Sequence, residues 1–431
     1  MQHATDFTIT RRRLLQVLGT GIGGVALAGP QRGWGQAASA VSAELPPFTG
    51  PGPNPYWNSV GPFATYPQKL PLIRLTDRPV QLETPRPYFA LPITPNDAFF
   101  VRWHLDRIPN AVDLAHWRLR VEGTVRRSLA LSFDNLLKDY PAVSLMAVNQ
   151  CSGNSRSRLQ RRVPGGQWGN GAMGNALWTG VRLKDLLATA QVPPAAVQVQ
   201  FEGLDRGEGP EGRGSSRFQK SLDLTNPVLD ECIVAYAMNG APLPLLNGFP
   251  VRLVVPGYFA TYWVKALTWI RTLDQPDENF WMKTGYRIAD TARGNTTPEA
   301  VASGQVHTVP LSSMPVRSFL VTPDHASKVP VGLPVTARGI AFSGAARVNR
   351  VEVSVDNGQH WRDAQLGEDQ GRYAFRTWSC AWTPEAEGKQ VLAVRATDER
   401  GNVQTDAPVW NPGGYLWNQI ERQEITVGPA H

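Results

Sequence analysis

The sequence is poor in cysteine and lacks most of the short motifs that mark common enzymes. Only Cys151, Cys232 and Cys380 occur among the 431 residues, and no CxxC pair is present. An odd number leaves at least one thiol unpaired, and without CxxC nothing supports zinc knuckles, thioredoxin chemistry or covalent haem attachment. GxSxG, HExxH and the phosphate-binding P-loop are absent as well. The motifs therefore give no support to serine hydrolase, zinc protease or nucleotide hydrolase chemistry.

Charge and long hydrophobic runs are also scarce. Charged residues make up 18% of the chain and hydrophobic residues 42%, so a large core can form and disorder is excluded as the main state. The 40 glycines and 36 prolines argue against a helical solenoid or coiled coil and favour short elements joined by shaped loops. The net charge is +7, and no basic run with interleaved aromatics follows the N-terminus. Nucleic-acid binding is therefore not expected.

The first 40 residues are typical of an export signal. Three arginines at positions 11–13 precede an apolar, glycine-rich stretch that reaches to about Ala28, and Ala38-Ser39-Ala40 offers a small-residue cleavage site. Paired arginines mark the twin-arginine route. The apolar stretch is too short and too rich in glycine for a membrane-spanning helix. We expect residues 1–40 to be a twin-arginine signal and the mature protein to work in the periplasm.

The hydrophobic pattern divides the remaining chain near residue 305. Residues 44–98 are rich in proline and polar turns and predict an extended wrapping segment. Helices are expected at 132–137 and 183–190, and strands at 99–105, 117–123, 143–148, 197–201, 231–237, 250–255 and 264–273. Strands at 335–340, 348–355, 372–379 and 390–397, with no helix between them, favour an immunoglobulin-like β-sandwich. The predicted fold class is α+β, with domains at 41–304 and 305–431.

Cys151 is the residue most informative about chemistry. It leaves a buried strand and enters a polar loop that ends at Arg156, and three more arginines follow within six residues. A cationic neighbourhood favours the thiolate, which is both a nucleophile and a soft-metal ligand. The alternative is a buried structural cysteine, which we favour for Cys232 and Cys380 because both lie within strand patterns.

The loop at 165–175 has an unusual composition, with five glycines in eleven residues. So many glycines predict backbone conformations that other residues avoid, or close approach of the backbone to a ligand. The loop does not begin with GxGxxG, so nicotinamide binding is not expected.

Arg102 and His104 project from one face of the strand predicted at 99–105, because strand side chains alternate. An arginine with a histidine suits an oxyanion site, since the first supplies fixed charge and the second can move protons. Arg156 could serve the same anion. The alternative is a surface strand with unrelated polar residues. Arg252 and Lys265 could bind phosphate, although solvated strand ends explain them better on the pattern alone.

Three segments resemble, in order and spacing, the sulfite oxidase family of molybdopterin enzymes. They are Phe100–His104 (FVRWH), Ala147–Arg156 (AVNQCSGNSR) and Gly248–Arg252 (GFPVR). The sequence is similar to the exported bacterial sulfite dehydrogenase type, and also to the molybdenum subunit of sulfane dehydrogenases. The resemblance implies a mixed α/β molybdopterin domain followed by an immunoglobulin-like domain that forms a homodimer.

The resemblance also implies roles for individual residues. Cys151 would be the thiolate ligand of molybdenum. Arg102, Arg156 and Tyr286 would line the pocket for the sulfur oxyanion, with His104 and Trp168 beside it. Asn247 stands where animal members have a histidine, which removes a titratable group. The positions that would hold the pterin and its phosphate are Phe100, Val101, Arg102, Trp103, His104, Asp205, Asn247, Arg252, Trp263, Val264 and Lys265.

The activity implied is oxidation of sulfite to sulfate, with electrons passed to an external acceptor such as cytochrome c or a small haem c subunit. No haem attachment motif occurs, so haem is not expected in this chain, and oxygen stays open as an acceptor. The main alternative is a sulfane dehydrogenase that acts on carrier-bound sulfur. Reductive chemistry on methionine sulfoxide or nitrate and a non-enzymatic exported β-sandwich are weaker alternatives. The domain composition gives no support to methionine sulfoxide or nitrate reduction. A non-enzymatic β-sandwich does not explain Cys151 and the glycine loop.

Overall fold

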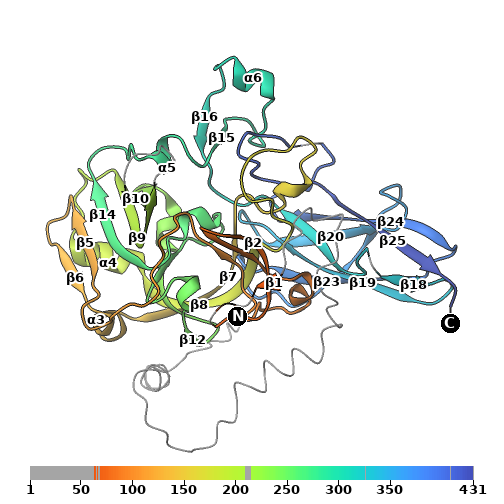
Figure 1. Cartoon of the computed structure of the whole chain (residues 1–431), viewed down its shortest axis with the longest axis horizontal. Coiled ribbons are helices and arrows are strands. Elements are labelled where there is room, and N and C mark those ends of the chain that lie inside the picture. The colour runs from red at the N-terminus through yellow and green to blue at the C-terminus, as the bar shows by residue number, and fades with distance from the viewer. Residues whose placement is uncertain are drawn as a thin grey trace, which may run out of the picture.

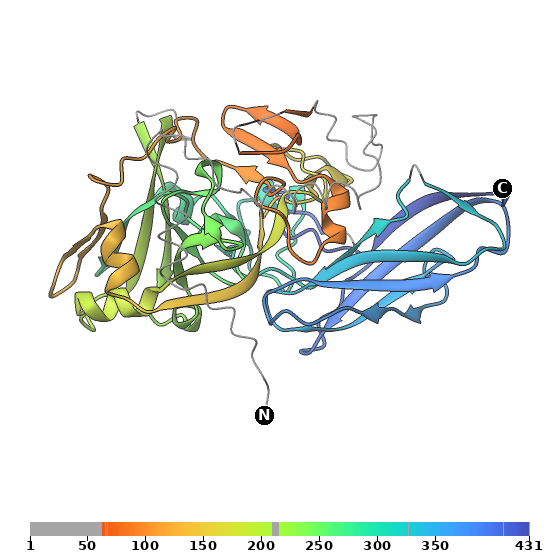
Figure 2. The same cartoon turned by 90° about the horizontal axis from the view of Figure 1, so that it is seen from below.

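The structure is a computed structural model that describes residues 63–64, 66, 68–208, 215–325, 327–407 and 409–430. β-Strands dominate the described residues, and the α-helices among them are short. The orange-to-green strands form one body, and the blue strands form a second body beside it (Figures 1 and 2). No helix in the described ranges is long and apolar enough to cross a membrane. The expected export signal at 1–40 lies outside the described residues.

Two sheets form most of the first body. One has the order β10-β9-β14-β5-β6, at Ser215–Asp223, Gln198–Glu208, Leu267–Leu273, Leu119–Gly123 and Leu129–Leu131. The other has the order β12-β11-β8-β7, at Ala241–Pro242, Ile233–Met238, Met173–Arg182 and Ala142–Gln150, and β13 (Arg252–Val254) also pairs with β11. Every residue of β11 is buried, which explains why this strand is a continuous apolar run without alternation.

The N-terminal strands form a smaller sheet in the order β1-β2-β3-β4, at Phe63–Ala64, Leu72–Asp77, Val80–Glu83 and Val101–Arg102. The expectation of an extended wrapping segment over 44–98 is therefore wrong in part, since β2 and β3 pair as a hairpin. β4 is shorter than the strand predicted at 99–105, because β3 offers only Gln81 and Leu82 as pairing partners.

Both predicted helices are confirmed. Helix α3 (Phe133–Lys138) begins after Ser132, whose hydroxyl accepts a 3.1 Å hydrogen bond from the Asn135 amide in a capping box. Helix α4 (Leu183–Ala190) buries Leu183, Leu186, Leu187 and Ala190, the spacing of one helix face. The other helical segments are α5 (Phe280–Lys283), α6 (Pro298–Ala302) and the 3-10 turns η1 (Arg86–Ala90), η2 (Arg156–Arg158), η3 (Pro227–Asp230), η4 (Leu245–Asn247) and η5 (Ala260–Tyr262).

The sequence did not predict β8, because the first residues of this strand belong to the glycine-rich loop at 165–175. Within this loop, Gly169, Gly171 and Gly174 do have the spacing GxGxxG. The segment leads into a strand, whereas a dinucleotide-binding turn leads into a helix. A Cβ atom at Gly174 would lie 2.7 Å from Cδ2 of the Phe99 ring. Close packing on the aromatic core therefore explains this glycine.

The second body consists of two sheets around one core. The first sheet has the order β17-β19-β23-β22, and the second has the order β18-β25-β24-β20-β21. Their strands lie at Arg317–Thr322, Val335–Phe342, Arg376–Trp382 and Gln365–Leu366, and at Lys328–Pro330, Glu421–Gly428, Gly388–Asp398, Val348–Ser354 and Arg362–Asp363. The shared core includes Leu320 and Trp378 from the first sheet and Val351 and Val394 from the second.

The four strands predicted in this body are confirmed with shifted ends, whereas β17 and β25 escaped prediction. Each begins with a buried charged residue, Arg317 or Glu421, so the hydrophobic alternation of a strand is broken at its start. Between the two bodies, β15 (Arg287–Ala289) pairs with β16 (Thr308–Pro310), and the segment between them carries α6 at the top of Figure 1.

Candidate active site

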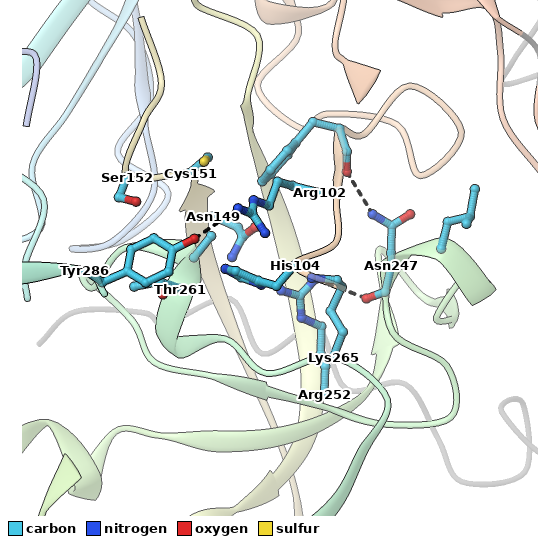
Figure 3. A pocket seen from close by; sticks show the side chains of 13 residues that line it. Arg102, His104, Asn149, Cys151, Ser152, Asn247, Arg252, Thr261, Lys265 and Tyr286 are labelled. Atoms are coloured by element: carbon cyan, nitrogen blue, oxygen red, sulfur yellow. Dashed lines mark hydrogen bonds between the residues drawn. The ribbon is translucent and has the colours of Figure 1, made fainter. Parts of the chain in front are cut away.

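One pocket brings together eight of the residues predicted for the site. It encloses about 400 Å³ of space between atoms, part of it open to solvent. Its predicted lining residues are Phe100, Arg102, His104, Cys151, Asn247, Arg252, Lys265 and Tyr286. They come from β4, the loop after β7, η4, β13 and the segments after η5 and α5 (Figure 3). Segments separated by more than 180 residues thus converge on one cavity.

Cys151 follows directly after β7 and is held at the pocket wall by a 2.9 Å hydrogen bond from its backbone N–H to the Ala172 carbonyl. Its side chain is a free thiol, as are those of Cys232 and Cys380. Burial raises the pKa of Cys232, which is typical of an inert core thiol. In the part of the chain that the structure describes, no cluster of three or more His, Cys, Asp or Glu side chains could hold a metal ion.

Four polar atoms in the pocket wall are buried and have no hydrogen-bond partner among the described residues. They are Nη1 of Arg102, Nδ2 of Asn149, Nε of Arg252 and Oγ1 of Thr261. A buried donor without a partner costs free energy, so such groups normally have a ligand or water in the functional state. The lining residues include three cationic side chains and no carboxylate. The wall therefore suits a large anionic ligand.

The Arg102 guanidinium is oriented by Tyr286. Its Nη2 donates a 3.0 Å hydrogen bond to the Tyr286 hydroxyl, and its Nη1 remains available to a ligand (Figure 3). Burial raises the pKa of Tyr286, and the nearby Arg102 charge opposes this shift, so the phenol is protonated at neutral pH. This pair presents a fixed positive charge beside a hydroxyl group at one end of the pocket.

His104 lies in an aromatic environment beside this pair. Its ring stacks on Phe218 at a centroid distance of 3.5 Å and contacts the Trp281 and Tyr286 rings edge to face. Burial and the positive charges of Arg102, Lys265 and Lys220 lower its pKa well below the usual 6.5. The imidazole is therefore neutral at physiological pH, with one donor and one acceptor nitrogen.

The other end of the pocket is lined by Arg252 and Lys265. The Arg252 guanidinium donates to the carbonyls of Asn247 (3.1 Å) and Trp263 (3.2 Å) and lies over the Trp178 ring. Burial lowers its pKa to about 9. Burial also lowers the pKa of Lys265, whose ammonium lies 4.6 Å from the centre of the Trp103 ring. Burying two cations is costly, and a bound anion offsets that cost.

Six of the predicted cofactor-binding and catalytic residues are buried and do not line the pocket. The Trp103 indole donates to the Leu246 carbonyl, and the Val264 carbonyl accepts from the Leu253 amide. Asp205 is buried and interacts with Lys265, and burial raises the pKa of its carboxyl group. The full set of six is Val101, Trp103, Trp168, Asp205, Trp263 and Val264.

Arg156 also lies outside the pocket wall. Its Nη1 donates to the Gly166 carbonyl at 2.8 Å, and its Nε and Nη2 donate to the Gly413 carbonyl at 3.1 and 2.9 Å. Its guanidinium lies 5.7 Å from the centre of the Tyr415 ring. In this structure, Arg156 links two glycine-rich loops from the two bodies.

The sequence pattern missed several residues of the site. Asn149 and Thr261 carry unpartnered polar atoms, but their residue types are too common to mark a site. Lys69 is buried behind Asn247, and its ammonium donates to the Asn247 side chain at 2.5 Å and to the Phe99 carbonyl at 3.0 Å. The Asn247 amide donates to the Phe100 carbonyl. Both ends of the Asn247 side chain are therefore occupied by protein groups.

Comparisons with known proteins place this site in a family. Residues 104–281 match the model of the oxidoreductase molybdopterin binding domain, and residues 309–428 match that of the Mo-co oxidoreductase dimerisation domain. Mitochondrial sulfite oxidase of Mus musculus is 35% identical over 385 residues, which cover 85% of this chain and 68% of that protein. Sulfite oxidase of Gallus gallus is 36% identical over 379 residues, which cover 82% and 78%. The chain belongs to the sulfite oxidase family.

A solved structure supports the same conclusion. The sulfane dehydrogenase SoxCD from Paracoccus pantotrophus matches with a TM-score of 0.69 and 26% sequence identity, over 82% of this chain and 88% of that chain. The cofactor of this molybdopterin oxidoreductase is molybdenum-molybdopterin. The residues present fit it, since Cys151 offers a thiolate, and Arg252 and Lys265 offer charge to a phosphate. The unpartnered donors of Asn149 and Thr261 offer hydrogen bonds to its polar atoms.

Proposed function

We propose that this protein oxidises sulfite to sulfate outside the cytoplasm and passes the two electrons to a separate acceptor such as cytochrome c. The observation that carries the proposal is the combination of Cys151 with three cationic side chains and no carboxylate in one pocket. The reaction consumes sulfite and water and yields sulfate, two protons and two electrons. Both substrate and product are small anions, which match the positive charge of the pocket.

The residues of the Arg102 end of the pocket would hold the substrate. Arg102 supplies charge and a free Nη1 donor to a sulfite oxygen, and the Tyr286 hydroxyl lies 3.0 Å from the same guanidinium. Neutral His104 can accept or donate one proton beside them. When bound, the molybdenum-molybdopterin group supplies the oxygen-transfer and two-electron chemistry. The protein supplies orientation and charge complementarity.

The proposal extends to the organisation of the protein. Residues 41–304 would be the molybdopterin domain, and residues 305–431 would be an immunoglobulin-like domain that forms a homodimer. The match of residues 309–428 to a dimerisation domain supports the second part. The arginines at 11–13 favour export to the periplasm, where a haem c protein would accept the electrons. Loss of periplasmic protein when Arg11 and Arg12 are both replaced by lysine would support this export route.

The direct test is sulfite oxidation by full-length protein from a host that inserts the molybdenum cofactor. Reduction of both cytochrome c and ferricyanide by sulfite would support a sulfite dehydrogenase with a haem acceptor. Reduction of ferricyanide alone would support sulfite as the substrate and contradict the cytochrome assignment. Reduction of neither, in protein shown to contain molybdenum, would contradict the proposal.

The variant Arg102→Gln tests the substrate-binding role. We expect the KM for sulfite to rise at least tenfold while the molybdenum content stays near that of the unchanged protein, because a charge-assisted hydrogen bond contributes about 1.5–3 kcal/mol. Arg107→Gln makes the same change at an exposed arginine and should leave the KM unchanged. An unchanged KM in Arg102→Gln would remove this role.

The second candidate function is oxidation of carrier-bound sulfane sulfur as one subunit of a larger complex. The structural match to the sulfane dehydrogenase SoxCD favours it. A loaded protein that ignores sulfite, but reduces ferricyanide when given a cysteine-persulfide peptide, would support this candidate over the first.

A further inference from the structure

A loop of the second body reaches the pocket of the first. The loop at Asn411–Trp417 lies between β24 and β25, beside the segment that carries Arg156 in the upper centre of Figure 1. The Asn411 side chain closes it into a turn, since its Oδ1 accepts from the Tyr415 amide and its Nδ2 donates to the Tyr415 carbonyl, both at 2.9 Å. The loop therefore presents Tyr415 in a fixed position.

Tyr415 stacks on the tyrosine that orients Arg102. The Tyr415 and Tyr286 rings lie 5.5 Å apart with an interplanar angle of 19°. Tyr286 has a φ of +57°, in the left-handed region that an aromatic residue rarely adopts. Its position is therefore imposed by its surroundings, and the Tyr415 ring covers one of its faces. A chain of contacts runs from Tyr415 through Tyr286 to Arg102.

Arg156 holds the Tyr415 loop through main-chain carbonyls. Each of its three guanidinium nitrogens donates to a carbonyl, two bonds going to Gly413 and one to Gly166. The fit is tight, because a Cβ at Gly414, where φ is +60°, would lie 2.8 Å from Cγ of Arg156. Its donors are engaged by the protein, and it does not line the pocket.

We propose that Tyr415 is a positioning residue for the reaction, which holds Tyr286 and through it Arg102, and that Arg156 acts by fixing the Tyr415 loop. The inference rests on the proposed oxidation of a sulfur oxyanion. The second body thereby completes the substrate end of a pocket that lies in the first body. Arg156 would contribute to substrate binding through Tyr415, without contacting the anion.

The test is a double-mutant cycle in full-length, molybdenum-loaded protein with Tyr415→Ala and Arg156→Met. We expect each single variant to raise the KM for sulfite about tenfold. The double variant should be no worse than the more affected single variant, because both substitutions release the same element. Effects that multiply to about a hundredfold would show that Arg156 acts separately and would overturn the proposal. A KM in Tyr415→Ala equal to that of the unchanged protein would also overturn it.

Conservative variants and a binding measurement separate positioning from general damage. Tyr415→Phe keeps the ring and should retain the KM within about threefold. Tyr373→Ala, a tyrosine whose hydroxyl bonds Glu231 between the two bodies, should leave the KM unchanged. Tyr415→Leu replaces the alanine variant in the cycle if the latter does not fold.

The same cycle is measured for sulfate affinity by calorimetry, which needs no turnover. If the unchanged protein does not oxidise sulfite, the proposed function fails, and the sulfate affinities alone decide the positioning role. A loss of sulfate affinity in the double variant that is no larger than in the more affected single variant would support that role. Unchanged affinities, or losses that multiply in the double variant, would contradict it.

Discussion

The protein buries arginines in two places and neutralises them in only one. At the seam between the two bodies, Arg158 donates to Glu421 at 2.8 Å, and the Arg86 guanidinium lies 3.6 Å from the same carboxylate. The Asn170 amide also donates to Glu421, and its carbonyl oxygen accepts from Arg317. The described residues that line the pocket provide no such carboxylate for Arg102 and Arg252.

The difference separates structural charge from functional charge. A buried cation needs an anion nearby, because desolvation otherwise outweighs its contacts. At the seam, Glu421 provides this anion, so the charged groups there stabilise the contact between the two bodies. The residues that line the pocket provide no carboxylate, so their positive charges favour binding of an anionic group from outside the chain. Two sets of wholly or partly buried arginines thus serve different purposes.

The largest effect is expected at the thiol of the pocket. Cys151→Ser should reduce sulfite turnover at least a thousandfold, because serine replaces a soft thiolate ligand with a hard hydroxyl group. Turnover per molecule and molybdenum content are the measurements. Cys380→Ala, at a cysteine in the core of the second body, should retain activity within about twofold. Full activity of Cys151→Ser would remove the metal-ligand assignment.

The next effect is on stability at the seam. Glu421→Gln removes the carboxylate bonded to Arg158 and should lower the free energy of unfolding by about 3–5 kcal/mol. Glu424→Gln is the matched control on the same strand, where an exposed pair with Lys389 contributes at most about 1 kcal/mol. Urea unfolding measures both. Equal effects of the two substitutions would contradict the structural role of the seam.

A smaller effect is expected on cofactor retention. Arg252→Met should weaken retention of molybdenum-molybdopterin about 10- to 100-fold, because it removes a charged donor from the pocket end near Lys265. The measurement is release of molybdenum from purified protein over time. The thermal stability of the cofactor-free protein should not fall, since the variant also removes an uncompensated buried charge. A lower thermal stability together with normal cofactor retention would show that Arg252 has a structural role and does not bind the cofactor.

The last effect, which is the smallest when counted per pH unit, concerns pH. Burial lowers the pKa of Lys220 to about 7, and the nearby Asp277 opposes this shift. Between pH 7 and about 10 the unfolded chain holds a proton on this lysine that the folded chain lacks. The free energy of unfolding should therefore rise with pH in this window, by at most about 1.4 kcal/mol per unit. Lys220→Met should reduce that slope, and an unchanged slope would contradict the shift.

The sequence predicted the parts of the site that local patterns encode. Alternation along 99–105 placed Arg102 and His104 together, and both line the pocket. The resemblance supplied Tyr286, which has no local signal. Lys69 and Tyr415 were missed because they lie in segments without periodicity and contact Asn247 and Tyr286, respectively, across more than 100 residues. Long-range packing of this kind leaves no trace in a local pattern.

The most direct test of the pocket as an anion site is a crystal structure of the molybdenum-loaded protein. We predict that Sγ of Cys151 is bonded to molybdenum and that Nη1 of Arg102, Nε of Arg252 and the side chains of Asn149 and Thr261 donate to the cofactor, substrate or ordered water. A cofactor bound elsewhere, with these four groups still unpartnered, would contradict the assignment.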